Sequence, residues 1–228
     1  MKSRETNHME AKIAAFAPLL LKWYHTEDKR SFPWRKSKNP YHILIAEIML
    51  QRTKADQVVP TYLSFIHHFP SVKELSDAKL SEIKAHFSGL GLLWRAKNVK
   101  KLADKLVSNS GEVPSKREQL MSLPSVGEYV ADAVLCFAYS RDTAIVDANV
   151  CRVIGRVFGL KPRGEARRDP AYRALAERLQ PRGKCKEFNW AMIDHGSLIC
   201  LSRGPLCYKC PLNKICEYAL TRGMSRTA

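Results

Sequence analysis

Four cysteines near the C-terminal end constrain how this chain can fold. They lie within 17 residues and have the spacing C-x6-C-x2-C-x5-C: Cys200, Cys207, Cys210 and Cys216. Thiolates this close in sequence can converge on one tetrahedral metal ion or one cubane cluster, and the chain between them must then wrap around that group. Zinc commonly occupies sites of four cysteines, but zinc ribbons usually present two C-x2-C pairs, and this segment has one. The spacing predicts a metal or cluster site and not a set of disulfides.

The chain is strongly basic. Its 228 residues include 38 Lys and Arg against 22 Asp and Glu, a formal net charge of +16. With 45% hydrophobic residues it has a globular composition, and the positive excess favours nucleic acid as a partner, with a ribosome-associated role or solubility alone as alternatives. No apolar run approaches a membrane span of roughly 18–20 residues, and the N-terminal segment is too polar for a signal peptide. We expect no membrane association and an intracellular location, either cytoplasmic and nucleoid-associated in a prokaryote or nuclear.

Nearly every segment has the periodicity of a helix. Ile13, Phe16, Leu20 and Trp23, for example, recur every three or four residues. Convincing alternation of the kind that a half-buried strand shows does not occur. We therefore predict an all-α fold, with helices near residues 13–24, 41–51, 55–69, 79–87, 96–108, 115–122, 128–139, 148–158, 170–179 and 189–198.

A short Pro/Gly segment separates two of these predicted helices. It reads Leu123-Pro124-Ser125-Val126-Gly127. Gly127 permits a positive φ and a close backbone approach, and the N–H groups that begin the next helix can hold a phosphate oxygen. Such a helix–hairpin–helix would grip a nucleic-acid backbone without reading its sequence. An ordinary turn between two helices is the alternative, and these five residues alone do not decide between the two.

The surrounding motifs resemble those of a known family. Asp147 lies eighteen residues after Tyr129 and directly before a predicted helix. Two further blocks are the run from Phe32-Pro33-Trp34-Arg35 to Gln51-Arg52-Thr53, and Gly89-Leu90-Gly91 followed by Arg95-Ala96-Lys97-Asn98. Together with the cysteine spacing, they resemble the helix-hairpin-helix DNA glycosylase superfamily, in its endonuclease III-like group. The chain is most similar there to thymine glycosylases of G/T mismatches and adenine glycosylases of A/G mismatches, from about Phe16 to Tyr218.

The resemblance implies two all-α lobes and a cofactor. Residues 31–141 would form a six-helix lobe that ends in the helix-hairpin-helix, and residues 1–30 and 142–228 would form the second lobe. That second lobe would carry a [4Fe–4S] cluster on the four C-terminal cysteines. In the family, the loop around the cluster presents basic residues to DNA, here Arg203 and Lys209. We expect a structural and DNA-docking role for the cluster.

Asp147 is the candidate catalytic carboxylate. Breaking an N-glycosidic bond passes through an oxocarbenium-like transition state, which a carboxylate near the sugar can stabilise while it orients or deprotonates a water. An Asp directly before an amphipathic helix is also an ordinary N-cap. The resemblance favours catalysis, and the two roles are compatible because the cap geometry orients the carboxylate.

Tyr129 and Glu47 complete the predicted catalytic set. Bifunctional endonuclease III-type enzymes carry a Lys at the position of Tyr129, whose amine forms a Schiff base and permits strand cleavage. The resemblance therefore implies a monofunctional enzyme without Lys-based lyase activity. Glu47 interrupts an apolar helix, where burial would favour the neutral acid that can protonate a departing adenine. For thymine, Glu47 would instead bind the base or a water, and a solvated carboxylate is the remaining alternative.

The remaining site residues are predicted DNA contacts. The target base must be flipped out of the duplex and its place filled. Gln51 and Arg52 stand where the family inserts a polar wedge, and Leu92 or Leu93 is a candidate apolar wedge, with burial in the core as the alternative. Backbone contacts are expected from the hairpin, and a charged contact is expected from the helix predicted at residues 148–158: Leu123, Pro124, Val126, Gly127 and Arg152.

These residues favour removal of thymine or uracil from G/T or G/U mismatches. Tyr129 and a chain that ends twelve residues after Cys216 both favour this over adenine removal from A/G or A/8-oxoguanine pairs, which stays the second interpretation. A cluster-bearing DNA-binding protein without catalytic activity is the third. The expected partner is double-stranded DNA with a mismatched or damaged base, and the protein is expected to be a monomer.

Overall fold

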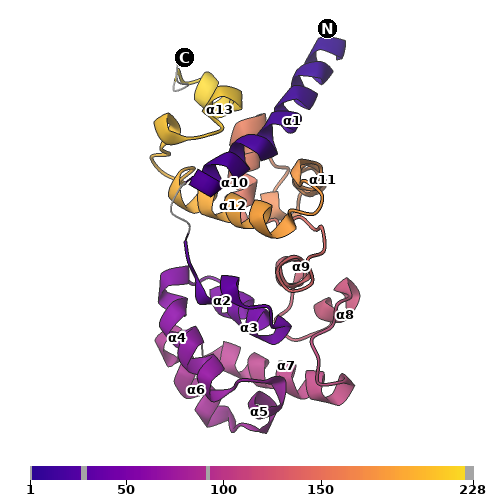
Figure 1. Ribbon diagram of the computed structural model, residues 1–228, viewed down its shortest axis with the longest axis vertical. Helices are drawn as coiled ribbons and strands as arrows, with labels where there is room; N and C mark the ends of the chain where they lie inside the picture. The colour runs from indigo at the N-terminus through magenta and orange to yellow at the C-terminus, as the bar shows by residue number, and fades with distance from the viewer. Residues whose placement is uncertain (1, 27–29, 91–92, 224–228) are drawn as a thin grey trace. The chain divides into compact units, whose positions relative to one another are not determined.

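The computed structural model describes residues 2–26, 30–90 and 93–223 (Figure 1). Within these ranges the chain forms α-helices and short 3-10 helices and no strand, so the predicted all-α class is confirmed. The α-helices are α1 (Lys2–Thr26), α2 (Pro33–Lys36), α3 (Pro40–Leu50), α4 (Ala55–His68), α5 (Val72–Asp77), α6 (Leu80–Phe87), α7 (Trp94–Asn109), α8 (Arg117–Met121), α9 (Glu128–Phe137), α10 (Ala148–Phe158), α11 (Pro170–Leu179), α12 (Cys185–Leu198) and α13 (Glu217–Leu220). The 3-10 helices are η1 (Ser88–Leu90), η2 (Ala166–Arg168), η3 (Cys207–Lys209) and η4 (Asn213–Ile215).

The chain divides into two compact units. Unit 1 consists of Met1–Arg30 and Arg141–Ala228, and unit 2 of Ser31–Ser140. The two lobes expected from the sequence have their boundary between residues 141 and 142, and their assignment as separate domains stays a prediction. Unit 1 carries more of the positive charge, with 23 Lys and Arg against 12 Asp and Glu, compared with 15 against 10 in unit 2.

Local capping chemistry explains where several helices begin. The Asn39 side chain accepts a hydrogen bond from the Tyr41 N–H at 2.9 Å, and Pro40 occupies the first position of α3. Helix α11 begins in the same way: the Asp169 side chain accepts a hydrogen bond from the Ala171 N–H at 2.9 Å, and Pro170 occupies the first position of the helix. These boundaries agree with the predicted ones because caps depend on neighbours in sequence.

Two helices begin four or more residues earlier than predicted. Helix α1 begins at Lys2 and not near residue 13, and α12 begins at Cys185 and not at 189. In α1, residues 6–10 are all exposed. Apolar periodicity marks only the part of a helix that faces a core, so an exposed polar extension of a helix leaves no such signal in the sequence.

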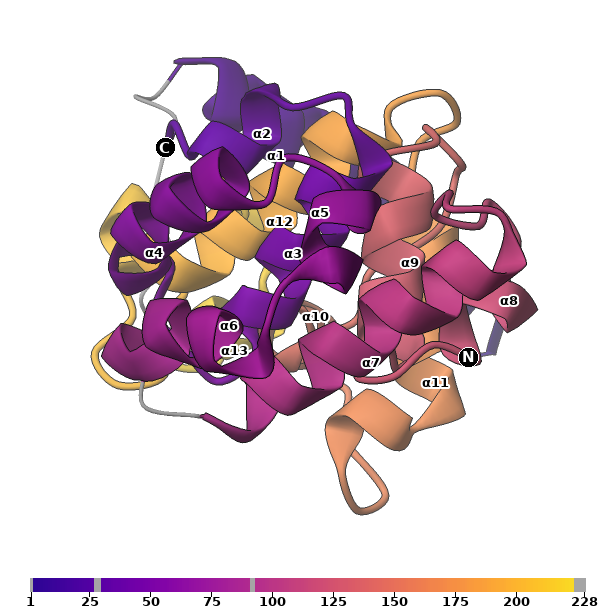
Figure 2. The same cartoon turned by 90° about the horizontal axis from the view of Figure 1, so that it is seen from below.

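Helix α3 forms the centre of unit 2. Figure 2 shows it between α4 and α9, and it packs against both. Leu44, Ile45, Ile48 and Met49 are fully buried in this core. A helix that is apolar on nearly all sides must be enclosed by other elements, and this one also carries Glu47 into the core.

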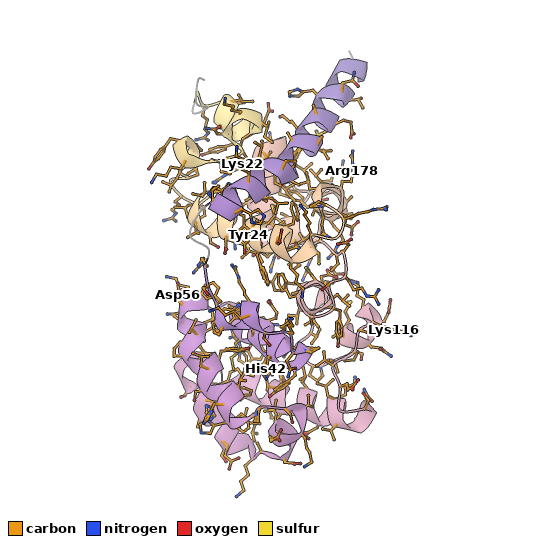
Figure 3. The ribbon with its side chains drawn as sticks, in the orientation of Figure 1. Lys22, Tyr24, His42, Asp56, Lys116 and Arg178 are labelled. Carbon is orange, nitrogen blue, oxygen red and sulfur yellow. The ribbon has the colours of Figure 1, made fainter. Side chains whose placement is uncertain are left out.

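Unit 1 is built around α10 and α12, with α1, α11 and α13 packed against them. The rings of Phe16 and Phe158 lie 5.7 Å apart, and those of Phe16 and Phe188 lie 6.4 Å apart. Two ion pairs join helices of unit 1. Arg178, labelled in Figure 3, binds Glu10 of α1 at 2.7 Å on the surface, and the buried Lys12 binds Glu217 of α13 at 2.7 Å. No helix in the described ranges is long and apolar enough to cross a membrane.

A histidine pair between α4 and α6 predicts acid sensitivity. The His68 and His86 rings lie 4.6 Å apart, and burial and then the charge of His68 lower the pKa of His86. The unfolded chain therefore binds a proton first as the pH falls below about 6.5, and stability is lost in that range. We expect the free energy of unfolding, measured with urea, to fall more between pH 7.5 and pH 5.5 in the wild type than in His86→Gln. An equal loss in the two proteins would contradict this, and His67→Gln, which changes an exposed neighbour, is the control.

Candidate functional site

Asp147 caps α10 and is held by two hydrogen bonds. Its Oδ1 accepts from the Val150 N–H at 2.7 Å, and its Oδ2 accepts from Asn149 Nδ2 at 3.0 Å. Burial raises the pKa of the Asp147 carboxyl above its ordinary value, although these hydrogen bonds and the charge of Arg152 act in the opposite direction. The N-cap interpretation is therefore correct, and the cap fixes a carboxylate that is more basic than a solvated one.

Behind Asp147, a chain of contacts leads to the cysteine segment. The Arg152 Nη2 donates to Asn149 Oδ1 at 2.8 Å and to Gly196 O at 2.7 Å, and its Nε donates to Cys200 O at 2.7 Å. A Cβ on Gly196 would lie 2.7 Å from the Asn149 Cβ, so only glycine allows α12 to pass this close. The Nε and Nη2 donors of Arg152 are thus used within unit 1, and a DNA contact from Arg152 stays a prediction.

The four predicted cysteine ligands line one cavity. Cys200 follows α12, Cys207 opens η3, Cys210 follows it, and Cys216 directly precedes α13. Two side-chain nitrogens lie beside its sulfurs: His195 Nε2 is 3.3 Å from Cys210 Sγ, and Arg156 Nη1 donates to Cys200 Sγ at 3.4 Å.

The donor set fits an iron–sulfur cluster. Burial raises the pKa of the Cys210 thiol to about 12, and burial also raises the pKa values of Cys207 and Cys216. A positively charged centre would allow these sulfurs to be thiolates together, and N–H donors near ligand sulfurs are common around such clusters. Within the described residues, no three His, Cys, Asp or Glu side chains lie close enough together to hold a single metal ion.

Glu47 lies in the core of unit 2. Only 3% of the residue is exposed, so the interpretation as a solvated helix carboxylate is wrong. Tyr129 is the second residue of α9 and is half-buried. Both residues belong to unit 2, whereas Asp147 and the four cysteines belong to unit 1.

The hairpin uses Ser125 and not Gly127 for its sharp turn. Ser125 has φ +64°, and the Val126 N–H donates to Leu123 O at 3.2 Å. Gly127 has φ −96°, so the expectation that this glycine adopts a positive φ is wrong. No atom lies within 4 Å of a Cβ built on Gly127, so the start of α9 is open to a close approach. Leu123 and Val126 are buried, which leaves the hairpin backbone as the part that could contact DNA.

The predicted wedge residues differ in exposure. Arg52 is exposed and has φ +57°, while the Gln51 Nε2 donates to Ser125 O at 2.9 Å. Leu93 is 51% exposed, so it is not a core residue, and Leu92 lies outside the described residues. Trp94, which the sequence analysis did not single out, is also 51% exposed and directly follows Leu93.

The cysteine segment presents basic side chains to solvent. Arg203 and Lys209 are exposed, and the Lys209 Nζ lies 5.7 Å from the centre of the Tyr208 ring. Tyr208 is 56% exposed and was also missed. The adjacency of Tyr208 and Lys209 was visible in the sequence, but the exposure of the ring was not, and an exposed aromatic ring beside a lysine is a common feature of nucleic-acid surfaces.

A helix–hairpin–helix, a carboxylate that heads the next helix and a four-cysteine cavity together define the class of endonuclease III-like DNA repair proteins. Residues 45–181 match the HhH-GPD superfamily of base excision DNA repair proteins. The chain belongs to this superfamily, as the resemblance predicted.

Three comparisons describe its relatives. It is 38% identical to a thymine/uracil-DNA glycosylase of Methanothermobacter thermautotrophicus, over 91% of this chain and 94% of the relative. It is 36% identical to an adenine DNA glycosylase of Buchnera aphidicola subsp. Baizongia pistaciae, over 89% of this chain and 58% of that relative. Among solved structures, a thermostable thymine-DNA glycosylase superposes with a TM-score of 0.89 at 37% identity, covering 93% of this chain and 99% of the other.

Proposed function

We propose that this protein is a monofunctional DNA glycosylase that hydrolyses the N-glycosidic bond of thymine or uracil opposite guanine. The observation that carries the proposal is the Asp147 carboxylate, which is fixed by Val150 and Asn149 and made more basic by burial. The thymine/uracil-DNA glycosylase relative and the superposed thymine-DNA glycosylase support the choice of base. An intracellular location follows from a role in DNA repair.

Asp147 acts on the sugar. As the glycosidic bond breaks, positive charge develops on the sugar ring, and a fixed carboxylate stabilises it without having to reorganise. The same group orients a water and takes up its proton as the water attacks. The two hydrogen bonds to Asp147 hold both carboxylate oxygens in place, so the group is positioned before the substrate binds.

The other two predicted catalytic residues define the leaving-group side. Thymine and uracil depart as stabilised anions, so they require no strong general acid. The buried Glu47 then binds the base or a water, and Tyr129 takes the place of the Lys that would form a Schiff base. Strand cleavage by the protein is therefore not expected.

DNA is held by backbone groups and by charge. The hairpin between α8 and α9 grips a phosphate, while Arg52 and Leu93 are the exposed groups that fill the gap left by the flipped base. Arg203 and Lys209 add phosphate contacts from the cysteine segment. The cysteines at 200, 207, 210 and 216 would hold a [4Fe–4S] cluster, which supplies a structural cross-link and no step of the reaction. The protein acts as a monomer on double-stranded DNA.

A panel of duplexes tests the proposal. Purified protein is incubated with duplexes that contain T·G, U·G, A·G, A·8-oxoguanine or matched pairs, and then treated with alkali to cleave abasic sites. We expect cleavage at T and U opposite G, no cleavage before alkali, and no adduct trapped by borohydride. A trapped covalent adduct would overturn the monofunctional assignment, and no cleavage of any duplex would leave only DNA binding.

Adenine removal is the second candidate function. The burial of Glu47 favours it, because burial disfavours the charged form of a carboxyl and a neutral carboxyl can donate a proton to a departing purine. The similarity to adenine DNA glycosylases also favours it. Cleavage at A opposite G or 8-oxoguanine in the same panel, without cleavage at T, would select this function.

A further inference from the structure

One face of α7 holds two loops of unit 2 together. Arg95 and Asn98 are three residues apart on this helix and therefore lie on the same face. Arg95 is fully buried, which is unusual for a charged side chain and requires good hydrogen-bond partners. The two loops are the turn at residues 51–53, which follows α3, and the hairpin at residues 123–127.

Arg95 holds the turn. Its Nη1 donates to Met49 O at 2.9 Å and to Thr53 Oγ1 at 3.0 Å, and its Nη2 donates to Gln51 O. Carbonyls at the C-terminal end of α3 have no further helical turn to bond them, and a cation there is also favoured by the helix dipole. Between these contacts lies Arg52, in a left-handed backbone conformation with φ +57°. Such a conformation persists in a non-glycine residue only where its surroundings enforce it.

Asn98 holds the hairpin and completes the connection. Its Nδ2 donates to Ser125 Oγ at 3.0 Å, and the Gln51 Nε2 donates to Ser125 O at 2.9 Å. Ser125, with φ +64°, is the second left-handed non-glycine residue in this arrangement. The turn and the hairpin are thus joined to α7 and to each other, and Gln51 serves as the link between them.

We propose that Arg95 and Asn98, which together form a brace on α7, are positioning residues for base flipping. They hold Arg52 at a fixed distance from the hairpin. When the hairpin binds a phosphate of the duplex, Arg52 therefore lies opposite the gap that the flipped base leaves. Gln51 is a strut in this arrangement, and Arg52 is the residue that enters the DNA. The inference rests on the proposed function, because it assigns residues that prepare the substrate for Asp147. Because the loops are already fixed in the free protein, less conformational entropy is lost when they bind DNA.

The test is a double-mutant cycle. Arg95→Lys keeps the charge but cannot reach three acceptors at once, and Asn98→Ala removes one hydrogen bond. Each is made in the wild type and in an Arg52→Ala background. Flipping is measured by the fluorescence of 2-aminopurine placed next to the target thymine, and excision is measured under single-turnover conditions. Matched-duplex binding is measured over a range of salt concentrations. Asn109→Ala, the same substitution at an exposed position of α7, is the control.

We expect each brace variant to lower flipping and excision by about tenfold while matched-duplex binding and its salt dependence change less than about twofold. In the Arg52→Ala background the further loss should be under about twofold, because the brace acts through Arg52. Losses of equal size in both backgrounds, or a parallel fall in matched-duplex binding, would overturn the proposal. If Arg95→Lys does not fold, Asn98→Ala carries the same test. A wild type that flips the base but excises nothing would reject the proposed function without rejecting the brace.

Discussion

Replacing Asp147 with Asn is expected to abolish excision and leave mismatch binding close to that of the wild type. The amide oxygen can still accept from the Val150 N–H, so the cap on α10 is kept. The negative charge that stabilises the sugar cation is lost, and loss of one fixed electrostatic group at a reacting centre costs about a hundredfold to a thousandfold in rate. The measurement is single-turnover excision at a T·G pair beside binding of the same duplex.

Stability provides an independent readout for the same variant. Because burial raises the pKa of Asp147, the folded state favours the protonated carboxyl, and this contribution is lost as the pH rises through the folded-state pKa. At neutral pH the charge therefore opposes folding, and Asp147→Asn should unfold at the same or a higher urea concentration than the wild type. Asp169→Asn, the same change at the N-cap of α11, should retain full excision. Turnover above a tenth of the wild-type rate in Asp147→Asn would remove the carboxylate from the mechanism.

Replacing Cys210 with Ala is expected to prevent binding of the proposed [4Fe–4S] cluster. Three remaining thiols cannot complete the four-cysteine set, so iron content and visible colour should both be lost. Between Leu198 and Glu217 the chain forms only two 3-10 helices, so we expect the conformation of this segment to depend on the proposed cluster. We expect this segment to become sensitive to proteolysis and binding of matched DNA to weaken, because Arg203 and Lys209 lose their fixed positions.

Cys185→Ala is the matched control for this experiment. Cys185 is also buried in unit 1, but it does not line the cysteine cavity. It should keep iron, colour and DNA binding. Elemental analysis of the wild type distinguishes the two kinds of centre that four cysteines commonly hold. A colourless wild-type protein with stoichiometric zinc, or a Cys210→Ala protein with full iron content, would overturn the cluster assignment.

Several site features could be predicted from the sequence because they depend on nearby residues. The spacing of the cysteines, the all-α class and the cap at Asp147 are properties of short segments, and each agrees with the structure. The resemblance to the family favoured interpretations that residue spacing alone left open. One example is the prediction that Asp147 is catalytic and not only an N-cap. The turn geometry of the hairpin was not predicted correctly. Gly127 permits a positive φ, but the packing of the loops places the positive φ at Ser125.

The class of fold, the cysteine set and the candidate carboxylate could all be identified from the order of residues along the chain. How side chains distant in sequence are used depends on the packing of the helices. This packing directs Arg152 toward Asn149, Gly196 and Cys200, and it encloses Glu47 in the core. The brace on α7 also appears only in the tertiary structure, since Arg95 and Gln51 are 44 residues apart. Periodicity and capping are set by neighbours along the chain, whereas burial and long-range hydrogen bonds are set by which helices pack together.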